Sequence, residues 1–327
     1  MLLRMLATLL AAAIALSACG SEDDNDGSAQ APAQPPPAAE PADFPSAKGK
    51  NLTQLTKGLR EGAILVPSSP RSQKPGDGNR FGFILVDKGN TRLKPSAVAV
   101  YTARPDGKEL RGPFVAREES LEVDTRYRSA QTESDLADGK SFFVAEPRFA
   151  SAGERVAVGI AQIDGQMVFA EPLMRLPVGA KNGPPDVGDR AIRIHTQTGA
   201  DVGGDLTRIT TRVPPAPELL DTDFADVLGK KPIVLLFATP ALCMSRTCGP
   251  VTDITEQVRA QNGDGVAFIQ QEIYKDNSPP NLRPQVNAWR LSTEPWAYVI
   301  DRKGKITARF EGAFSTGELA RAVAKVQ

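Results

Sequence analysis

The sequence predicts two domains of different class, an all-β domain followed by an α/β domain. Residues from about 60 to 178 hold short alternating apolar runs separated by turn residues, whereas the later residues alternate strand-like and helix-like patterns. The chain of 327 residues also leaves about 280 after an N-terminal leader and a polar stretch, which is enough for two domains of ordinary size.

The first 18 residues have the layout of a secretory signal peptide. Arg4 precedes an apolar segment from Met5 to Ala15, which is too short to span a membrane. The string Leu16-Ser-Ala-Cys19 then resembles the lipoprotein box of bacterial lipoproteins. That resemblance implies a Cys19 that carries lipid chains such as palmitate, with about 0.8 kcal/mol for each buried methylene. We therefore expect a protein anchored to the cell membrane on its extracytoplasmic face, at the cell surface or in the periplasm; the alternative is an ordinary cleavage site.

Residues 19–58 are predicted to form a disordered tether behind the lipidated Cys19. The stretch opens with the acidic cluster Glu22–Asp26 and continues with Ala, Pro and Gln residues through Pro37. Such a composition buries too little apolar surface to offset the entropy of ordering. No later segment reaches the roughly 18 consecutive apolar residues of a membrane-spanning helix.

Residues 59–180 are predicted to form an immunoglobulin-like β-sandwich. The expected strands are short and apolar, and turn signals such as Asp164-Gly165 separate them. They cover residues 63–66, 80–86, 97–102, 141–144, 155–160 and 167–170. Residues 116–140 are polar and irregular, so a long loop is expected there. The sequence shows no site chemistry in this domain, which favours a spacer or docking module over a ligand-binding domain.

Residues 181–327 are predicted to form the α/β domain. The fully apolar run 232–238 indicates a strand buried on both faces, and Pro250 suits the first turn of the helix that follows. The remaining expected elements are a short helix at 222–228, a strand at 265–269, a hairpin of 296–300 with 305–310, and a final helix from Ser315, where Glu318 completes a capping box.

Composition excludes several classes of function. Lys and Arg number 39, as do Asp and Glu, so nothing favours a nucleic acid partner. The single histidine, His195, stands in the alternating run 192–196, where we expect a solvent-facing strand residue. A single histidine cannot form a histidine-rich metal site and makes a Ser/His triad improbable. No cofactor is expected.

Cys243 and Cys248 follow the buried strand 232–238 and are predicted to form a redox-active dithiol. A cysteine near a helix N-terminus is stabilised as a thiolate by unpaired backbone N–H groups and the positive end of the helix dipole. Exchange needs one accessible thiolate that attacks and a second thiol that resolves the mixed disulfide. Arg246 lies between the two cysteines, where we expect it to lower a thiol pKa further.

The order of elements in this domain resembles that of the thioredoxin fold, and two strings resemble TlpA-like and redoxin-type thioredoxins. These are 235–240 followed by Cys243, and 293–304 with Pro295 near its start. The resemblance implies that Cys243 is the exposed nucleophile, that Cys248 resolves, and that Pro295 is cis and lies against the dithiol. Glu294, before that proline, is an unusual charge that is expected to tune the dithiol or its choice of partner.

The sequence also departs from that family. Four residues separate Cys243 from Cys248 instead of two, Leu242 stands where a tryptophan is usual, and the strand 233–238 lacks the buried carboxylate that many thioredoxins use as a proton acceptor. An inert structural disulfide is therefore one alternative for this cysteine pair.

These observations predict a membrane-anchored thiol–disulfide oxidoreductase. Its partners would be protein thiols and disulfides or a membrane electron donor. A peroxiredoxin-like thiol peroxidase is an alternative, because Ser245-Arg-Thr-Cys248 is similar to the peroxidatic motif. A second alternative is a non-enzymatic binding lipoprotein on a thioredoxin-like scaffold. Copper-chaperone Sco proteins share the two-cysteine loop, but no histidine follows residue 195 to complete their metal site.

Overall fold

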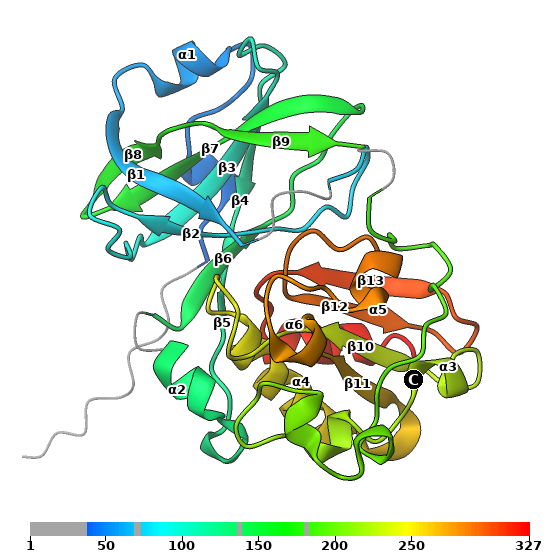
Figure 1. The fold of residues 1–327 in the computed structure, drawn as a ribbon. Coiled ribbons are helices and arrows are strands. Elements are labelled where there is room, and N and C mark those ends of the chain that lie inside the picture. The colour runs from blue at the N-terminus through cyan, green and yellow to red at the C-terminus, as the bar shows by residue number, and fades with distance from the viewer. Residues whose placement is uncertain (1–37, 69–72, 136–138, 180–182) are drawn as a thin grey trace, which may run out of the picture. The chain divides into compact units, whose positions relative to one another are not determined.

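A computed structural model describes residues 38–68, 73–135, 139–179 and 183–327 (Figure 1). The predicted signal peptide, the lipidation site at Cys19 and the tether up to Pro37 lie outside the described residues. Within the described ranges, no helix is long and apolar enough to cross a membrane. The part from Ala38 to Gln327 forms one compact unit.

Residues 38–58 are ordered, so the prediction of a disordered tether as far as residue 58 is wrong for this stretch. It contains the 3₁₀ helix η1 (Pro41–Asp43) and helix α1 (Leu52–Thr56), which Asn51 caps. Phe44 and Leu55 are buried against strands of the β domain, and the Tyr101 hydroxyl donates a 2.6 Å hydrogen bond to the carbonyl of Pro45. These apolar side chains bury enough surface to offset the entropy of ordering the stretch.

The β domain is built on one connected sheet in the order β4-β3-β7-β8-β1-β2-β6-β5, with β9 beside β7. The strands are β1 (Arg60–Pro67), β2 (Phe81–Val86), β3 (Ala97–Ala103), β4 (Arg111–Val115), β5 (Arg117–Ser120), β6 (Ser141–Ala145), β7 (Gly153–Ile163), β8 (Gln166–Ala170) and β9 (Met174–Val178). Only Ala116 separates β4 from β5, so the two ends of this sheet are neighbours in sequence and the sheet is nearly closed.

The predicted immunoglobulin-like sandwich is not confirmed, because the two halves of this sheet are not separate. Strand β1 pairs antiparallel with β2 and parallel with β8, and it thereby joins the halves. Alternation in β3 explains its packing: Val98 and Val100 enter the core between the halves, whereas Tyr101 faces the outer cluster with Phe44.

The segment 117–135 is not the irregular loop that was predicted. It forms β5, the 3₁₀ helix η2 (Thr125–Tyr127) and helix α2 (Ala130–Asp135). Leu121 and Val123 share a hydrophobic core with Val251 and Ile254 of the C-terminal domain. The polar composition of this segment reflects its ion pairs and hydrogen bonds, which run to residues far away in the sequence.

The C-terminal domain contains a four-stranded sheet in the order β11-β10-β12-β13. Strands β10 (Ile233–Phe237) and β11 (Ala267–Gln271) run parallel, whereas β12 (Trp296–Ile300) is antiparallel to β10 and to β13 (Ile306–Glu311). The helices are α3 (Phe224–Val227), α4 (Cys248–Asn262), α5 (Pro284–Ala288) and α6 (Thr316–Val323). The order of elements inferred from the thioredoxin resemblance is thereby confirmed (Figure 1).

Local signals in this domain predicted their elements correctly. The Ser315 hydroxyl accepts a 3.1 Å hydrogen bond from the backbone N–H of Glu318, whose carboxylate accepts one from the N–H of Ser315 in return. In α4, the predicted apolar face of Val251, Ile254 and Val258 is fully buried. Every residue of β10 is buried as well.

His195 is exposed, as predicted, but it does not lie in a strand. The segment from Ala191 to Thr198 pairs with no other strand. Side chains of the C-terminal domain hold it instead: Trp289 Nε1 donates to the carbonyl of Ile192, and Gln285 Nε2 donates to that of His195. The ring of His195 contacts Asp223, with 2.6 Å between Nδ1 and Oδ2.

Candidate dithiol site

Three segments of the C-terminal domain meet at one edge of its sheet. Phe237 at the end of β10 pairs with Gln271 at the end of β11 and with Trp296 at the start of β12. The chain therefore leaves β10 toward the cysteines, leaves β11 toward Tyr274 and enters β12 from Pro295, all at the same edge. Parallel and antiparallel register alone places these segments together.

The loop between the cysteines folds back on itself. Cys248 is the first residue of α4 and is fully buried, whereas Cys243 is partly exposed and both are free thiols. Arg246 adopts a left-handed φ of 53°, and its backbone N–H donates a 3.3 Å hydrogen bond to the carbonyl of Cys243. The spacing of four residues is thus closed by a turn that returns the chain to the start of the helix.

The thiolate of Cys243 is held by several donors. The thiol of Cys248 has the largest effect on the pKa of Cys243, and the Ser245 hydroxyl and the backbone N–H groups of Thr247 and Cys248 contribute further hydrogen bonds. These donors outweigh burial and lower the pKa of Cys243 to about 6. The Cys243 sulfur lies 3.2 Å from Ser245 Oγ, which is 2.7 Å from Thr247 Oγ1.

Cys248 has the opposite character. Burial, followed by its contact with Cys243, raises the pKa of its thiol well above the usual value. At neutral pH one sulfur is therefore an ionised, partly exposed nucleophile, and the other is a buried thiol that donates to it. This asymmetry is the division of roles that thiol–disulfide exchange requires.

The other residues expected at the site, Pro295, Glu294 and Arg246, differ in burial and in the groups they interact with. Pro295 is buried and follows a cis peptide bond, and its carbonyl accepts a 2.8 Å hydrogen bond from Gly312. Glu294 is half-buried, and burial raises the pKa of its carboxyl group. Its charge acts on Cys248. Arg246 is exposed, and its charge acts on Asp135 of α2.

A buried carboxylate that the sequence analysis missed supports the cysteine loop. Glu272 accepts hydrogen bonds from the backbone N–H and the hydroxyl of Thr211, at 2.9 and 3.0 Å. The Thr211 hydroxyl in turn accepts a 3.1 Å hydrogen bond from the backbone N–H of Ala241, two residues before Cys243. Glu272 directly follows strand β11. Because parallel strands end at the same edge of a sheet, the sequence alone could have placed Glu272 near the residues that follow β10.

Tyr274 was also missed. It follows the same strand, and the charges of Glu294, Cys243, Cys248 and Glu272 all contribute to a raised pKa of its phenol, after burial as the first cause. Tyr274 therefore lies within electrostatic range of the dithiol. The same strand register that locates Glu272 would have located Tyr274.

Helix α2 brings the β domain to the first turn of the cysteine helix. A Cβ atom on Gly249 would lie 3.0 Å from Gln131 Cβ and 3.1 Å from Asp135 Oδ2. Burial raises the pKa of Asp135 to about 6, against the opposing charge of Arg246. No local pattern marks Asp135, because its place depends on docking between the two domains.

A hollow of about 600 Å³ separates the cysteine loop from the β domain. Residues 244–247 form one wall, while Val86, Arg92 and Asp135 belong to the other. Met244, directly after Cys243, is 94% exposed. The β domain thus lines one side of the hollow next to the cysteine loop.

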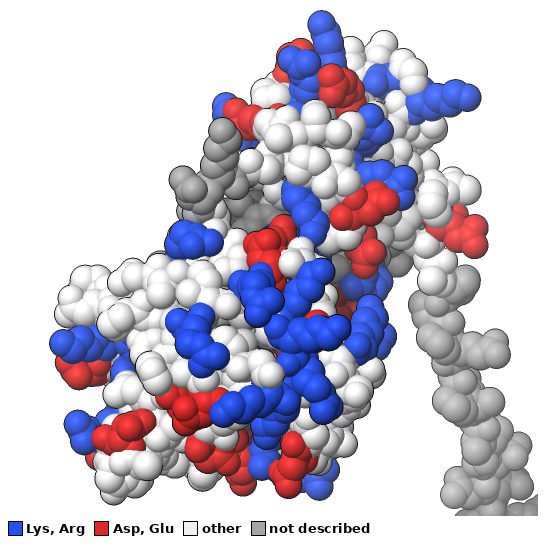
Figure 2. Space-filling model, turned by 90° about the vertical axis from the view of Figure 1, so that its right-hand side faces the viewer, with Lys and Arg blue, Asp and Glu red and all other residues white. Residues whose placement is uncertain are grey.

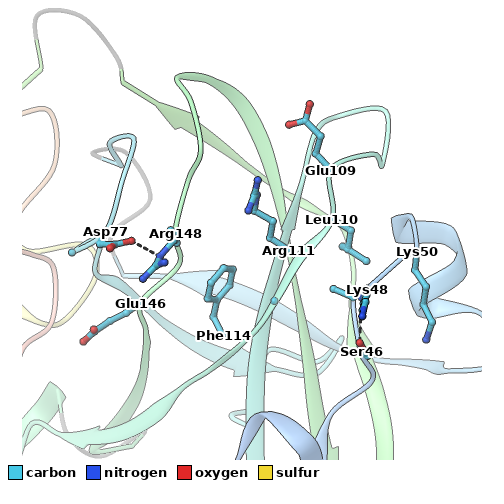
Figure 3. Close-up of a pocket in the computed structure, with 14 residues that line it drawn as sticks. Ser46, Lys48, Lys50, Asp77, Glu109, Leu110, Arg111, Phe114, Glu146 and Arg148 are labelled. Carbon is cyan, nitrogen blue, oxygen red and sulfur yellow. Dashed lines mark hydrogen bonds and ion pairs between the residues drawn. The ribbon is translucent and has the colours of Figure 1, made fainter.

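Another hollow, of about 770 Å³, lies in the β domain away from the cysteines. Its charged side chains point in different directions, and Asp77 pairs with Arg148 across one end (Figure 3). Although the formal charge of the whole chain is zero, Lys and Arg side chains gather on one face of the lower part of the molecule in Figure 2. Neither feature brings nucleophiles or buried acids together.

The described residues contain no group of three or more His, Cys, Asp or Glu side chains placed to hold a metal ion. The imidazole of His195 contacts Asp223 and is otherwise exposed.

Comparison with known proteins gives matches among solved structures alone. No protein-family model matches the chain, and no curated protein matches it. A thiol:disulfide interchange protein DsbE from Chlorobium tepidum has a TM-score of 0.31 and 14% identity, over 43% of this chain and 97% of its own. A thioredoxin-family interchange protein from Chlorobium tepidum TLS has a TM-score of 0.29 and 15% identity, over 43% of this chain and 98% of its own.

A thioredoxin-like superfamily protein matches with a TM-score of 0.26 and 18% identity, over 32% of this chain and 85% of its own. Each of these matches covers less than half of this chain, at low identity and low TM-score. The thioredoxin-like topology of the C-terminal domain rests on its own strand order, strand directions and connections, as described above.

Proposed function

We propose that this protein is a thiol–disulfide oxidoreductase that acts through Cys243 and Cys248. The observation that carries the proposal is the asymmetry of the two thiols. Cys243 is partly exposed and has its pKa lowered to about 6 by hydrogen bonds, while Cys248 is buried beside it with a raised pKa. An inert structural pair has no need of such an arrangement.

The reaction proceeds in two exchanges. The Cys243 thiolate attacks one sulfur of a partner disulfide, whose S–S bond breaks while the other partner sulfur leaves as a thiolate. Cys248 then attacks the sulfur of Cys243, so that a Cys243–Cys248 bond forms and the first partner sulfur leaves. The protein dithiol is oxidised and the partner is reduced; the reverse sequence oxidises a partner dithiol.

Pro295 and the hollow beside residues 244–247 are proposed to receive the partner. Pro295 is buried at the start of β12, at the same sheet edge as the cysteines. Its placement supports a role in shaping the groove for partner backbone. Protein thiols and disulfides, or a membrane electron donor, are the proposed partners.

Lipidation at Cys19 is proposed to hold the enzyme at the membrane on the extracytoplasmic side. The lipoprotein box and the preceding apolar segment support this proposal. Disulfides persist in that compartment and require dedicated proteins to handle them. The location therefore agrees with the proposed chemistry.

Burial of Cys248 favours exchange over the peroxidase alternative. A peroxidatic cysteine must meet hydroperoxide as a thiolate, yet Cys248 is 0% exposed and its pKa is raised. Cys243 has the properties of the attacking group instead. Peroxide consumption that depends on Cys248 but not on Cys243 would reverse this preference.

The experiment is reduction of insulin and of glutathione disulfide by the full-length protein, with Cys243→Ser and Cys248→Ser as matched variants. We expect the wild type to turn over, Cys243→Ser to be inactive, and Cys248→Ser to accumulate a mixed disulfide on Cys243 that mass spectrometry detects. Wild-type activity that does not exceed that of Cys243→Ser would contradict the proposal and leave a binding protein on a thioredoxin-like scaffold.

A further inference from the structure

The β domain forms one wall of the hollow beside the cysteine loop, although exchange itself requires only the two sulfur atoms of the C-terminal domain. Met244 and Ser245 line this hollow of about 600 Å³ from the cysteine loop, and Ile84 lines it from the β domain. The hydroxyl oxygen of Ser245 lies 3.2 Å from the sulfur of Cys243. The reactive sulfur is therefore at the edge of a space that both domains enclose.

The geometry of a mixed disulfide brings a partner chain to this hollow. The two Cα atoms of a disulfide are about 4.4–6.8 Å apart, and each residue of an extended chain adds about 3.3 Å. Residues within two or three positions of the partner's cysteine therefore reach the residues next to Cys243. Met244 directly follows Cys243 and is 94% exposed, so its side chain is open to such a contact.

Apolar side chains line the hollow from both domains. Ile84 and Val86 belong to β2, Leu121 follows β5, and Met244 lies on the cysteine loop. A methionine side chain adapts its shape to the group that it contacts, and such a contact removes apolar surface from water. An apolar residue next to the partner's cysteine fits this part of the hollow.

The guanidinium group of Arg92 is held in the wall that the β domain contributes. Arg92 forms a backbone bridge with Val86, and its Nη1 donates a 2.5 Å hydrogen bond to the carbonyl of Ser141. A Cβ atom on Gly139 would lie 2.6 Å from Arg92 Cδ. The position of the Arg92 side chain therefore requires a glycine at residue 139, and the side chain has a fixed place in the wall.

Positive charge exceeds negative charge around the hollow. The charged residues among those that line it are Arg92 and Arg246 on one side of the count and Asp135 on the other. Charges of opposite sign across an interface steer the encounter and select the partner. This excess of guanidinium groups favours a partner segment that carries a carboxylate.

We propose that the hollow between the cysteine loop and the β domain selects the partner, an inference that rests on the proposed exchange function. The partner is an extended protein segment with an apolar residue next to its cysteine and a carboxylate two or three residues away. Met244 contacts the apolar residue, and Arg92 contacts the carboxylate. The β domain thereby determines which disulfides reach Cys243.

The test uses four short peptides, each of which carries its single cysteine as a mixed disulfide with nitrothiobenzoate. They combine leucine or serine next to the cysteine with glutamate or glutamine two residues further along, and each is made in both sequence directions. The Cys243 thiolate bonds to the peptide sulfur, the bond from that sulfur to nitrothiobenzoate breaks, and nitrothiobenzoate leaves as a coloured thiolate. Stopped-flow mixing with full-length reduced protein gives the second-order rate constant of this first exchange.

We expect two preferences in the wild type, in at least one sequence direction. Leucine should react at least about threefold faster than serine, because its burial is favourable. Glutamate should react about three- to fivefold faster than glutamine, the upper range for an ion pair at a partly exposed site. The glutamate preference should largely disappear in about 0.5 M salt, whereas the leucine preference should persist.

Variants assign each preference to its residue. Arg92→Gln should lose the glutamate preference, Arg92→Lys should retain part of it, and Met244→Ala should lose the leucine preference. Each preference is a ratio of two rates on the same variant, so a change in the reactivity of the thiol cancels. Arg60→Gln, on exposed β1 outside the hollow, and Val187→Ala, 43% exposed, are the matched controls and should keep both preferences.

The outcomes separate the selectivity from the exchange function. Equal rates for all four peptides in the wild type, or a glutamate preference that persists in Arg92→Gln, would overturn the inference. Thermal melts show whether each variant folds, and the salt dependence of the wild type tests the charge contact without any variant. Release of nitrothiobenzoate that is no faster than in Cys243→Ser for every peptide would instead overturn the exchange function itself.

Discussion

Gly249 in the cysteine helix and Gln131 in α2 are so close that a Cβ atom on Gly249 would lie 3.0 Å from Gln131 Cβ. Gln131 comes from the β domain, and its side-chain carbonyl accepts a 3.0 Å hydrogen bond from the backbone N–H of Val213. The first turn of the helix that carries Cys248 is therefore covered by the other domain. This packing couples the integrity of the β domain to the geometry of the dithiol.

Gly249→Ala should destabilise the protein despite the higher helix propensity of alanine. The gain of about 1 kcal/mol in a helix is offset by overpacking of about 1–3 kcal/mol, because the backbone N of Thr132 also lies 3.3 Å from the added atom. Denaturant unfolding measures the effect. Gly265→Ala, where nothing lies within 4 Å, is the control. The two terms leave a net loss of up to about 2 kcal/mol, so a Gly249→Ala variant that is more stable than the wild type would refute close packing here.

Asp253→Ala should cost about 1.5–3 kcal/mol of unfolding free energy, because the buried Arg212 loses one of its two carboxylate partners and keeps only Glu256. Asp253 is 0% exposed and accepts from Arg212 Nε at 2.8 Å and from the Ser129 backbone N–H at 2.7 Å. Glu122→Gln removes an exposed ion pair with Lys140 and should cost less than about 1 kcal/mol. Similar losses in the two variants would show that the network does not hold the domains together.

The rate of Cys243 alkylation by iodoacetamide should rise with pH through a midpoint near 6, since the thiolate is the reactive form and the pKa is about 6. The lowered pKa keeps Cys243 ionised from neutral pH upward, and reactivity falls as the pH drops below that value. Mass spectrometry of alkylated peptides separates Cys243 from the buried Cys248. A midpoint near the ordinary value of about 8.5 would contradict the described hydrogen bonds.

Substitutions of the donors should raise the pKa of Cys243 in a fixed order. The thiol of Cys248 contributes more than the hydroxyl of Ser245, so Cys248→Ala should shift the alkylation midpoint further upward than Ser245→Ala does. For Ser245→Ala we expect a rise in the pKa of Cys243 of about one unit, which corresponds to the lower end of the roughly 1.5–3 kcal/mol for a hydrogen bond to a charged group, because Ser245 is exposed. The reverse order would show that the two thiols do not share a hydrogen bond.

Cys19→Ala should release the protein from the membrane. Lipid attachment is the proposed anchor, so the variant should move from the membrane pellet to the soluble fraction and lose incorporation of labelled palmitate. Cys243→Ser serves as the control for a cysteine outside the lipoprotein box and should remain in the pellet. Unchanged membrane association of Cys19→Ala would contradict the proposed lipid anchor.

Features that depend on neighbouring residues could be predicted from the sequence. The run 232–238, the apolar face of α4 and the capping box of Ser315 with Glu318 are local patterns, and each forms as expected. The thioredoxin-like order of elements followed from them. Cys243 begins a turn, and Cys248, five residues later, begins helix α4. Their proximity was therefore also a local prediction.

Features that depend on distant residues were not predictable from pattern alone. Residues 117–135 looked like a polar loop because Arg117 pairs with Glu318 and Ser129 pairs with Asp253, 201 and 124 residues away. Strand β1 pairs with both β2 and β8, and this pairing replaces the expected sandwich. No local pattern indicates it, because β1 and β8 are about 100 residues apart in the sequence. Phe44 and Leu55 order the end of the predicted tether because a surface for them exists on the folded β domain.

The reduction potential of the Cys243–Cys248 pair, measured in full-length protein against a glutathione redox buffer, tests the central claim most directly. Two neighbouring sulfur atoms that exchange bonds with partners should equilibrate with the buffer, at a potential near or above about −230 mV. A pair that stays oxidised throughout the buffer range, with a potential below about −300 mV, would be a structural disulfide and would contradict the account.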